Sequence, residues 1–77
     1  MAVGFVLIST LPGKEHEVFK RLKEVPQLVE IHPLFGEYDI IAKVESDTIE
    51  SIGQIVVDKI RSIEGVIDTK TLPGIKF

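Results

Sequence analysis

The spacing of hydrophobic residues predicts a strand, a helix, two strands, a second helix and a final strand. The segment Ala2–Thr10 is apolar on both of its alternating faces, which is typical of a central strand in a sheet. A Leu-Pro-Gly turn at residues 11–13 ends this strand. From residue 14 to residue 25 the apolar positions recur at helical spacing on one face, and Pro26 ends the predicted helix.

The segment 27–35 alternates between two sets of residues and predicts a second strand. Pro33 cannot donate a hydrogen bond to a neighbouring strand, so we expect this strand at an edge of the sheet. Gly36 and Glu37 form a short connection to a third strand at 38–45. A link this short predicts an antiparallel hairpin.

The second helix is predicted to begin at Asp47, with Glu50 three residues later as in a capping box. Isoleucine and valine residues at helical spacing from Ile49 to Ile63 mark its buried face. Gly65 is predicted to end the helix, and the segment 66–72 forms the last strand.

The element order is therefore β-α-β-β-α-β, which predicts an α+β fold of the ferredoxin-like class. Two right-handed crossovers place both helices on one face of a four-stranded antiparallel sheet, with the first and third strands in its centre. The other face has no helix to cover it. On it we expect Ile41 and Leu28, and from the first strand either Val3, Phe5 and Leu7 or the alternative pair Val6 and Ile8. An apolar face of this size predicts sheet-to-sheet packing of two subunits, a dimeric αβ sandwich.

Composition supports association as the source of stability. The chain has 77 residues, of which 44% are hydrophobic, and it contains no cysteine. This length suits a single domain over residues 1–77, and a domain this small has a thin core. Because disulfides cannot stabilise it, oligomerisation is the expected remedy.

Charge and hydrophobicity along the chain argue against nucleic acid and membranes as partners. Acidic residues number 12 and basic residues 9, which gives a net charge of −3 without any basic run. Direct binding to nucleic acid is therefore not expected. No apolar stretch reaches the roughly 18 residues of a membrane span, so no membrane partner is expected. No targeting signal is visible, and the expected location is the cytoplasm.

The sequence lacks the motifs of common catalytic and cofactor sites. It has no glycine-rich phosphate loop, no Gly-x-Ser-x-Gly, no His-Glu-x-x-His and no cysteine nucleophile, so we expect neither an enzyme nor a bound cofactor or metal. His16 is predicted to be a solvated helix residue. His32 is predicted to be an interface or hydrogen-bonded histidine, because no second histidine or carboxylate flanks it at ligand spacing.

The segment Phe35–Asp39 combines two aromatic residues, a glycine and two carboxylates at a hairpin. One interpretation is structural: Gly36 takes a positive φ, Asp39 bonds the turn amides, and Tyr38 covers the hairpin end. The other is capture of a small zwitterion. Backbone N–H groups near Gly36 would bind a carboxylate, and Asp39 or Glu37 would pair with an ammonium group.

Three segments together resemble one family: residues 12–15 (Pro-Gly-Lys-Glu), residues 36–40 (Gly-Glu-Tyr-Asp-Ile), and Gly65-Val66 followed by Thr69 and Thr71. In order and spacing they resemble the ligand-binding domain, or RAM domain, of the Lrp/AsnC transcription regulators, over essentially the whole chain. Family members usually carry an N-terminal helix-turn-helix domain, whereas this chain begins at the first strand. It is similar to the stand-alone RAM proteins, and DNA binding is not carried over.

The resemblance implies sheet-to-sheet dimers that assemble into rings, often octamers, with amino acids bound between dimers. The family's glycine-x-aromatic-aspartate loop corresponds to Gly36, Tyr38 and Asp39. In the family the last strand of a second subunit often contributes to the site, and the corresponding residues here are Thr69 and Thr71. The implied role is a non-enzymatic amino-acid sensor that modulates a full-length regulator by co-assembly.

Three alternatives remain open from the sequence. One is an ACT-type allosteric domain, which has the same topology. Another is a small dimeric ferredoxin-like enzyme, a cofactor-free monooxygenase or an isomerase, for which only His32, Tyr38 and Asp39 would be available as catalytic groups. The third is an assembly protein without a ligand.

Overall fold

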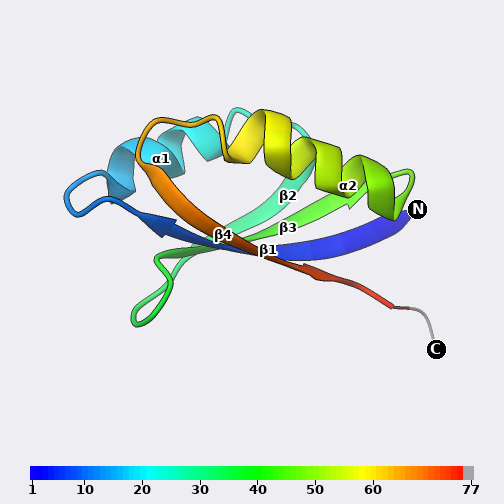
Figure 1. Ribbon diagram of the computed structural model, residues 1–77, viewed down its shortest axis with the longest axis horizontal. Coiled ribbons are helices and arrows are strands. Elements are labelled where there is room, and N and C mark those ends of the chain that lie inside the picture. Colours follow the sequence, from blue (N-terminus) through cyan, green and yellow to red (C-terminus); the bar gives the residue numbers. More distant parts are fainter. Residues whose placement is uncertain (76–77) are drawn as a thin grey trace.

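The computed structural model describes residues 1–75 as a four-stranded sheet with its helices on one side (Figure 1). The elements are β1 (Ala2–Thr10), α1 (Glu15–Leu22), β2 (Leu28–Pro33), β3 (Ile40–Ser46), α2 (Ile49–Ile55), a π-helical segment η1 (Val56–Ile60) and β4 (Val66–Pro73). The predicted βαββαβ order and the ferredoxin-like class are confirmed. In this part of the chain no helix has the length and apolar character needed to cross a bilayer.

The strands lie in the order β2-β3-β1-β4, and every neighbouring pair is antiparallel. The predicted central positions of β1 and β3 and the edge position of β2 are therefore confirmed. Pro33, the last residue of β2, pairs with Ile40 on β3 at the hairpin, and its missing N–H costs no hydrogen bond on the outer side of an edge strand.

The core lies between the sheet and the helices, and it settles which face of β1 is covered. Val6 and Ile8 are fully buried under the helices, whereas Phe5 on the opposite face is exposed. The other fully buried large side chains come from both layers and are those of Val18, Leu22, Ile40, Val44, Ile52 and Ile60. Of the two alternatives from the sequence, the uncovered face therefore carries Val3, Phe5 and Leu7.

The prediction that Leu28 lies on the uncovered face is wrong. Leu28 is buried in the core, and so is its partner on β3, Val44. The register between β2 and β3 shifts between Leu28 and Glu30, which inserts one extra residue into β2. Because a bulge reverses the alternation of faces, both Leu28 and Ile31 pack toward the helices, which simple alternation along the strand does not allow.

The start of α2 also differs from the prediction. The helix is capped by Thr48 rather than Asp47, and the capping box is completed by Ser51 rather than Glu50. Thr48 Oγ1 accepts a hydrogen bond from the Ser51 N–H at 3.0 Å, and Ser51 Oγ accepts one from the Thr48 N–H at 3.2 Å. Thr48 has the extended backbone of an N-cap residue, and a threonine hydroxyl is among the preferred capping groups.

Candidate functional site

The loop between β2 and β3 is fixed to the end of β1 by Asp39. The carboxylate oxygen Oδ2 of Asp39 accepts hydrogen bonds from the Thr10 N–H at 2.8 Å and from Thr10 Oγ1 at 3.2 Å. The Asp39 N–H donates to the Ile8 carbonyl at 2.9 Å, and the Leu34 N–H donates to the Asp39 carbonyl at 2.8 Å. Asp39 therefore anchors the loop to β1, and the predicted bonds from its carboxylate to turn amides are wrong.

Gly36 lies at the tip of this loop with a φ of 130°, so the predicted positive φ is confirmed. A side chain built at Gly36 would meet no atom within 4 Å, and only the backbone conformation requires glycine there. The neighbouring Phe35 is fully exposed. Glu37 is exposed as well, and Tyr38 is half-buried.

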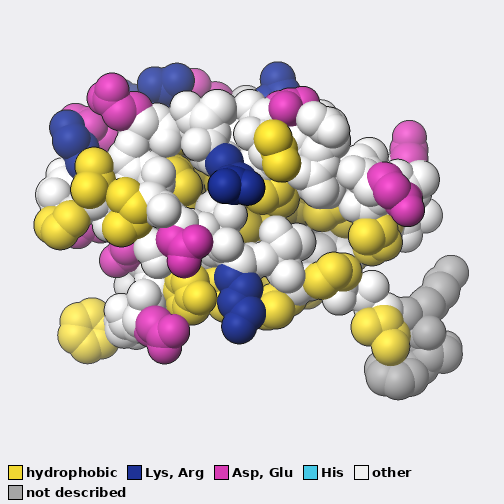
Figure 2. Space-filling view, in the orientation of Figure 1, with side chains coloured by type: hydrophobic (Ala, Val, Ile, Leu, Met, Phe, Trp, Pro, Cys, Tyr) yellow, Lys and Arg dark blue, Asp and Glu magenta, His cyan; other side chains and the backbone are white. Residues whose placement is uncertain are grey.

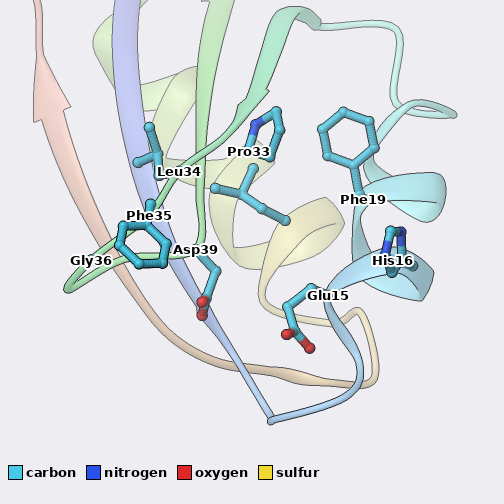
Figure 3. Close-up of a pocket in the computed structure, with 9 residues that line it drawn as sticks. Glu15, His16, Phe19, Pro33, Leu34, Phe35, Gly36 and Asp39 are labelled. Carbon is cyan, nitrogen blue, oxygen red and sulfur yellow. The ribbon is translucent and has the colours of Figure 1, made fainter.

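A pocket of about 540 Å³ lies between this loop and the first turns of α1. Its lining residues are Glu15, His16, Phe19, Pro33, Leu34, Phe35, Gly36, Asp39 and Ile40. Figure 3 shows that they come from two separate parts of the chain, the loop with its flanking strands on one side and α1 on the other. This volume is within the range of about 300–1,000 Å³ that is common for small-molecule sites.

The structure brings only part of the predicted site together. Gly36 and Asp39 line the pocket, whereas Glu37 and Tyr38 belong to the same loop without lining it. Thr69 and Thr71 are half-buried on β4, which pairs with β1 on the side away from β3. Within one chain the threonines are therefore separated from the loop by β1.

Helix α1 contributes to this pocket, which the sequence did not predict. His16 is exposed, as predicted, and it also lines the pocket together with Glu15 and Phe19. Their positions in the first turns of an amphipathic helix give no signal of a site, because solvated helix residues show the same pattern. Only the packing of α1 beside the end of β2 brings these side chains to the loop.

The pocket has an acidic end and an apolar end. In Figure 3 the carboxylates of Glu15 and Asp39 lie at the lower end, while Phe19 and Pro33 face each other at the upper end. No lysine or arginine is among the lining residues. The nearby Lys14 forms its ion pair with Glu17, at 3.4 Å, rather than with Glu15.

The sheet face that the helices leave uncovered, called the open sheet face below, has an apolar centre. Its apolar side chains are those of Val3, Phe5, Leu7, Ile41 and Leu72, which the strand register places on the same side. The predicted position of Ile41 on this face is confirmed, since it pairs with Leu7 on β1. In Figure 2 hydrophobic side chains lie along the lower side of the molecule, beneath the sheet, next to charged ones.

Charged residues occupy the β2 side of the open sheet face. His32 Nε2 lies 3.2 Å from Glu30 Oε1, and Lys43 Nζ lies 3.7 Å from the other Glu30 oxygen. The hydrogen bond with His32, followed by the charge of Lys43, holds the pKa of the Glu30 carboxyl below its usual value. His32 is thus hydrogen-bonded, as predicted, although its partner is a carboxylate that the sequence pattern did not indicate. Within residues 1–75 no group of three potential metal-ligating side chains is present.

Comparison with known proteins gives consistent matches. The family model described as the Lrp/AsnC ligand binding domain matches residues 3–76. An uncharacterised helix-turn-helix-type transcriptional regulator of Pyrococcus horikoshii is 38% identical over 72 residues, which are 90% of this chain and 48% of the regulator. The chain thus spans about half the length of the curated relatives it matches.

Two solved structures illustrate the similarity of fold. A hypothetical protein from Pyrococcus horikoshii has a TM-score of 0.89 at 38% identity, covering 100% of this chain and 93% of that one. A transcriptional regulator from Neisseria meningitidis, solved as its complex with L-Met, has a TM-score of 0.85 at 21% identity, covering 97% of this chain and 50% of the regulator. At this lower identity the likeness establishes the fold alone.

Proposed function

The chain belongs to the Lrp/AsnC family, as its ligand-binding domain, and from this we propose that it is a non-enzymatic module that binds a free amino acid. The module assembles through its open sheet face into dimers and from these into rings such as octamers. It modulates transcription in the cytoplasm by assembling with a full-length Lrp/AsnC-type regulator. The L-Met complex of the neisserial regulator and the transcriptional names of the relatives support this proposal.

The observation that carries the proposal is the pocket beside the Gly36–Asp39 loop. Both hydrogen bonds to Asp39 use Oδ2, so Oδ1 is available to an ammonium group. The backbone at Gly36 is open on the side where a Cβ would stand, which allows the ligand's carboxylate to approach the main-chain N–H groups. Glu37 and Tyr38 lie at the junction between dimers, and Thr69 and Thr71 of another subunit face the loop there.

The expected affinity is modest. A free amino acid has about ten heavy atoms, and at ~0.6 kcal/mol per atom the binding free energy is ~6 kcal/mol, a Kd in the tens of micromolar. This range suits a sensor of metabolic pools. A thermal-shift screen of the twenty amino acids tests the proposal, because a ligand at a hundred times its Kd adds about 2.7 kcal/mol of stability.

Asp39→Asn should weaken amino-acid binding about ten- to a hundredfold, which corresponds to roughly 1.5–3 kcal/mol for a lost charge-assisted hydrogen bond. The asparagine oxygen can still accept the hydrogen bond from the buried Thr10 N–H, so the loop stays anchored. Gly36→Val should abolish binding, because a β-branched residue does not adopt a φ of 130°. Calorimetric titration of each variant measures both effects.

Gly13→Val is the matched control for Gly36→Val, because it introduces the same kind of backbone strain outside the pocket. Gly13 also has a positive φ, 86°, and open surroundings, and it does not line the pocket. This variant should bind the ligand as the wild type does. If Asp39→Asn and Gly36→Val also retain wild-type affinity, the loop is only a turn and the proposed site is wrong.

The purified protein alone should not bind duplex DNA. Its net charge is −3, and α1 carries acidic residues in its first turn and basic residues in its last turn, so this helix offers no continuous basic face to neutralise phosphates. A gel-shift experiment at moderate salt should show no specific complex at micromolar protein. A specific shift at nanomolar concentration would contradict an indirect mode of action through a full-length regulator.

A further inference from the structure

The acidic end of the pocket is suited to the amino group of a ligand. It is not suited to a carboxylate on the ligand's side chain. Asp39 keeps Oδ1 available beside the loop, and Glu15 faces the same end from α1. No lysine or arginine lines the pocket, and His16 is the one basic side chain among the lining residues beside the two carboxylates. A ligand ammonium is attracted to this end, and a carboxylate on the ligand's side chain is repelled from it.

The opposite end offers mainly apolar surface, and His16 is the other polar side chain that α1 adds to the lining besides Glu15. In Figure 3 Phe19 of α1 faces Pro33 across the pocket. Leu34 and Ile40 are further apolar residues of the lining. A second charged group on a ligand would lie against this wall without a hydrogen-bond partner, and burial without a partner is unfavourable. The cavity of about 540 Å³ leaves room for a large side chain.

We propose that this pocket selects amino acids with bulky, uncharged, apolar side chains, and that Glu15 and Phe19 of α1 set the selectivity. The inference rests on the proposed function and names the class of ligand for the same site. Glu15 adds to the attraction for the ammonium group, and Phe19 packs against the ligand's side chain. The ligand's own carboxylate lies toward the Gly36 backbone, away from both acidic residues.

The first experiment compares ligands by calorimetric titration of the wild-type protein. Leucine, methionine and phenylalanine should bind at least about tenfold more tightly than lysine, aspartate or glycine, since each methylene in an apolar pocket contributes a factor of this order. Two analogues of leucine, each lacking one of its charged groups, distinguish the contributions of the amino group and the carboxylate to binding. Isoamylamine, which lacks the carboxylate, should still bind, whereas 4-methylpentanoate, which lacks the amino group, should not.

The second experiment tests the two α1 residues. Phe19→Ala should weaken the binding of leucine and of phenylalanine at least about tenfold. The binding of glycine should not change, because glycine has no side chain to reach the aromatic ring. Phe19→Leu, which keeps an apolar side chain, should retain most of the affinity and guards against a folding defect. Glu15→Gln should weaken the binding of every ligand that has an amino group. Glu17→Gln, in the same helical turn and outside the pocket, is its matched control.

The outcomes separate this inference from the proposed function. If lysine or aspartate binds as tightly as leucine, the selectivity is wrong while amino-acid binding stands. If Phe19→Ala weakens the binding of glycine and leucine equally, or if Glu15→Gln and Glu17→Gln have the same affinity for the ligands, the assigned roles of α1 are wrong. If no amino acid binds, the proposed function itself fails, and this inference with it.

Discussion

Ile41→Glu should prevent the proposed dimer from forming and give monomers or aggregates. Ile41 lies in the centre of the open sheet face, opposite Leu7 on β1 and His32 on β2. Packing this face against a second copy would bury the new carboxylate without a partner. An unpaired buried charge costs about 3–5 kcal/mol, which weakens dimerisation by roughly two to four orders of magnitude. Light scattering and sedimentation at micromolar concentration measure the change.

Val57→Glu is the matched control for this substitution. Val57 is also a β-branched apolar residue, but it is exposed on η1, in the helical layer on the other side of the molecule. Adding the same charge there should leave the dimer intact. A wild-type protein that is monomeric at micromolar concentration, or an Ile41→Glu variant that still dimerises, would show that the open sheet face is not the interface.

Gly65→Ala should strongly destabilise the folded protein. Gly65 connects the second helix to β4 with a φ of 104°, which alanine adopts only under strain. An added Cβ would lie 2.9 Å from Val18 Cγ2 and 3.2 Å from Lys14 Cβ, and Val18 is fully buried. The Gly65 carbonyl also accepts a hydrogen bond from the Leu11 N–H at 2.8 Å, which holds the turn in place.

Backbone strain of about 1–3 kcal/mol and overpacking of about 1–3 kcal/mol together give a loss of roughly 2–6 kcal/mol. For so small a domain each kcal/mol lowers Tm by about 4–8 °C, so the melting transition should fall by at least about 8 °C. Gly53→Ala is the control, because Gly53 is helical and has nothing within 4 Å of the added Cβ. That variant should be as stable as the wild type or slightly more stable. Thermal and urea unfolding followed by circular dichroism distinguish the two.

The sequence by itself determined the order of the elements and the ferredoxin-like class. Hydrophobic periodicity reports which residues of a segment share a face, and the breaks at residues 11–13, at Pro26 and at Gly65 separate the segments. The edge position of the strand with Pro33 and the positive φ of Gly36 also follow from local chemistry. These features depend on residues within a few positions of one another, so they can be read from the chain.

Which face of β1 the helices cover was decided by the tertiary structure. Both of its faces are apolar, and only the packing of the helices against Val6 and Ile8 selects between them. Leu28 shows the same limit, because the bulge that turns it into the core depends on pairing with β3. The choice of Thr48 over Asp47 as the cap of α2 likewise depends on which backbone is extended at that point.

The candidate site divides in the same way. Gly36 and Asp39 could be predicted, because a glycine and a carboxylate at a hairpin form a recognisable local pattern. Glu15, His16 and Phe19 could not, since their helix shows only an ordinary amphipathic pattern, and the hydrogen bonds of Asp39 reach Thr10, 29 positions earlier in the chain. A pocket forms where distant segments meet, and local sequence patterns carry no record of contacts at such separations. The chain therefore encodes the loop locally, and only the docking of α1 beside it produces the cavity.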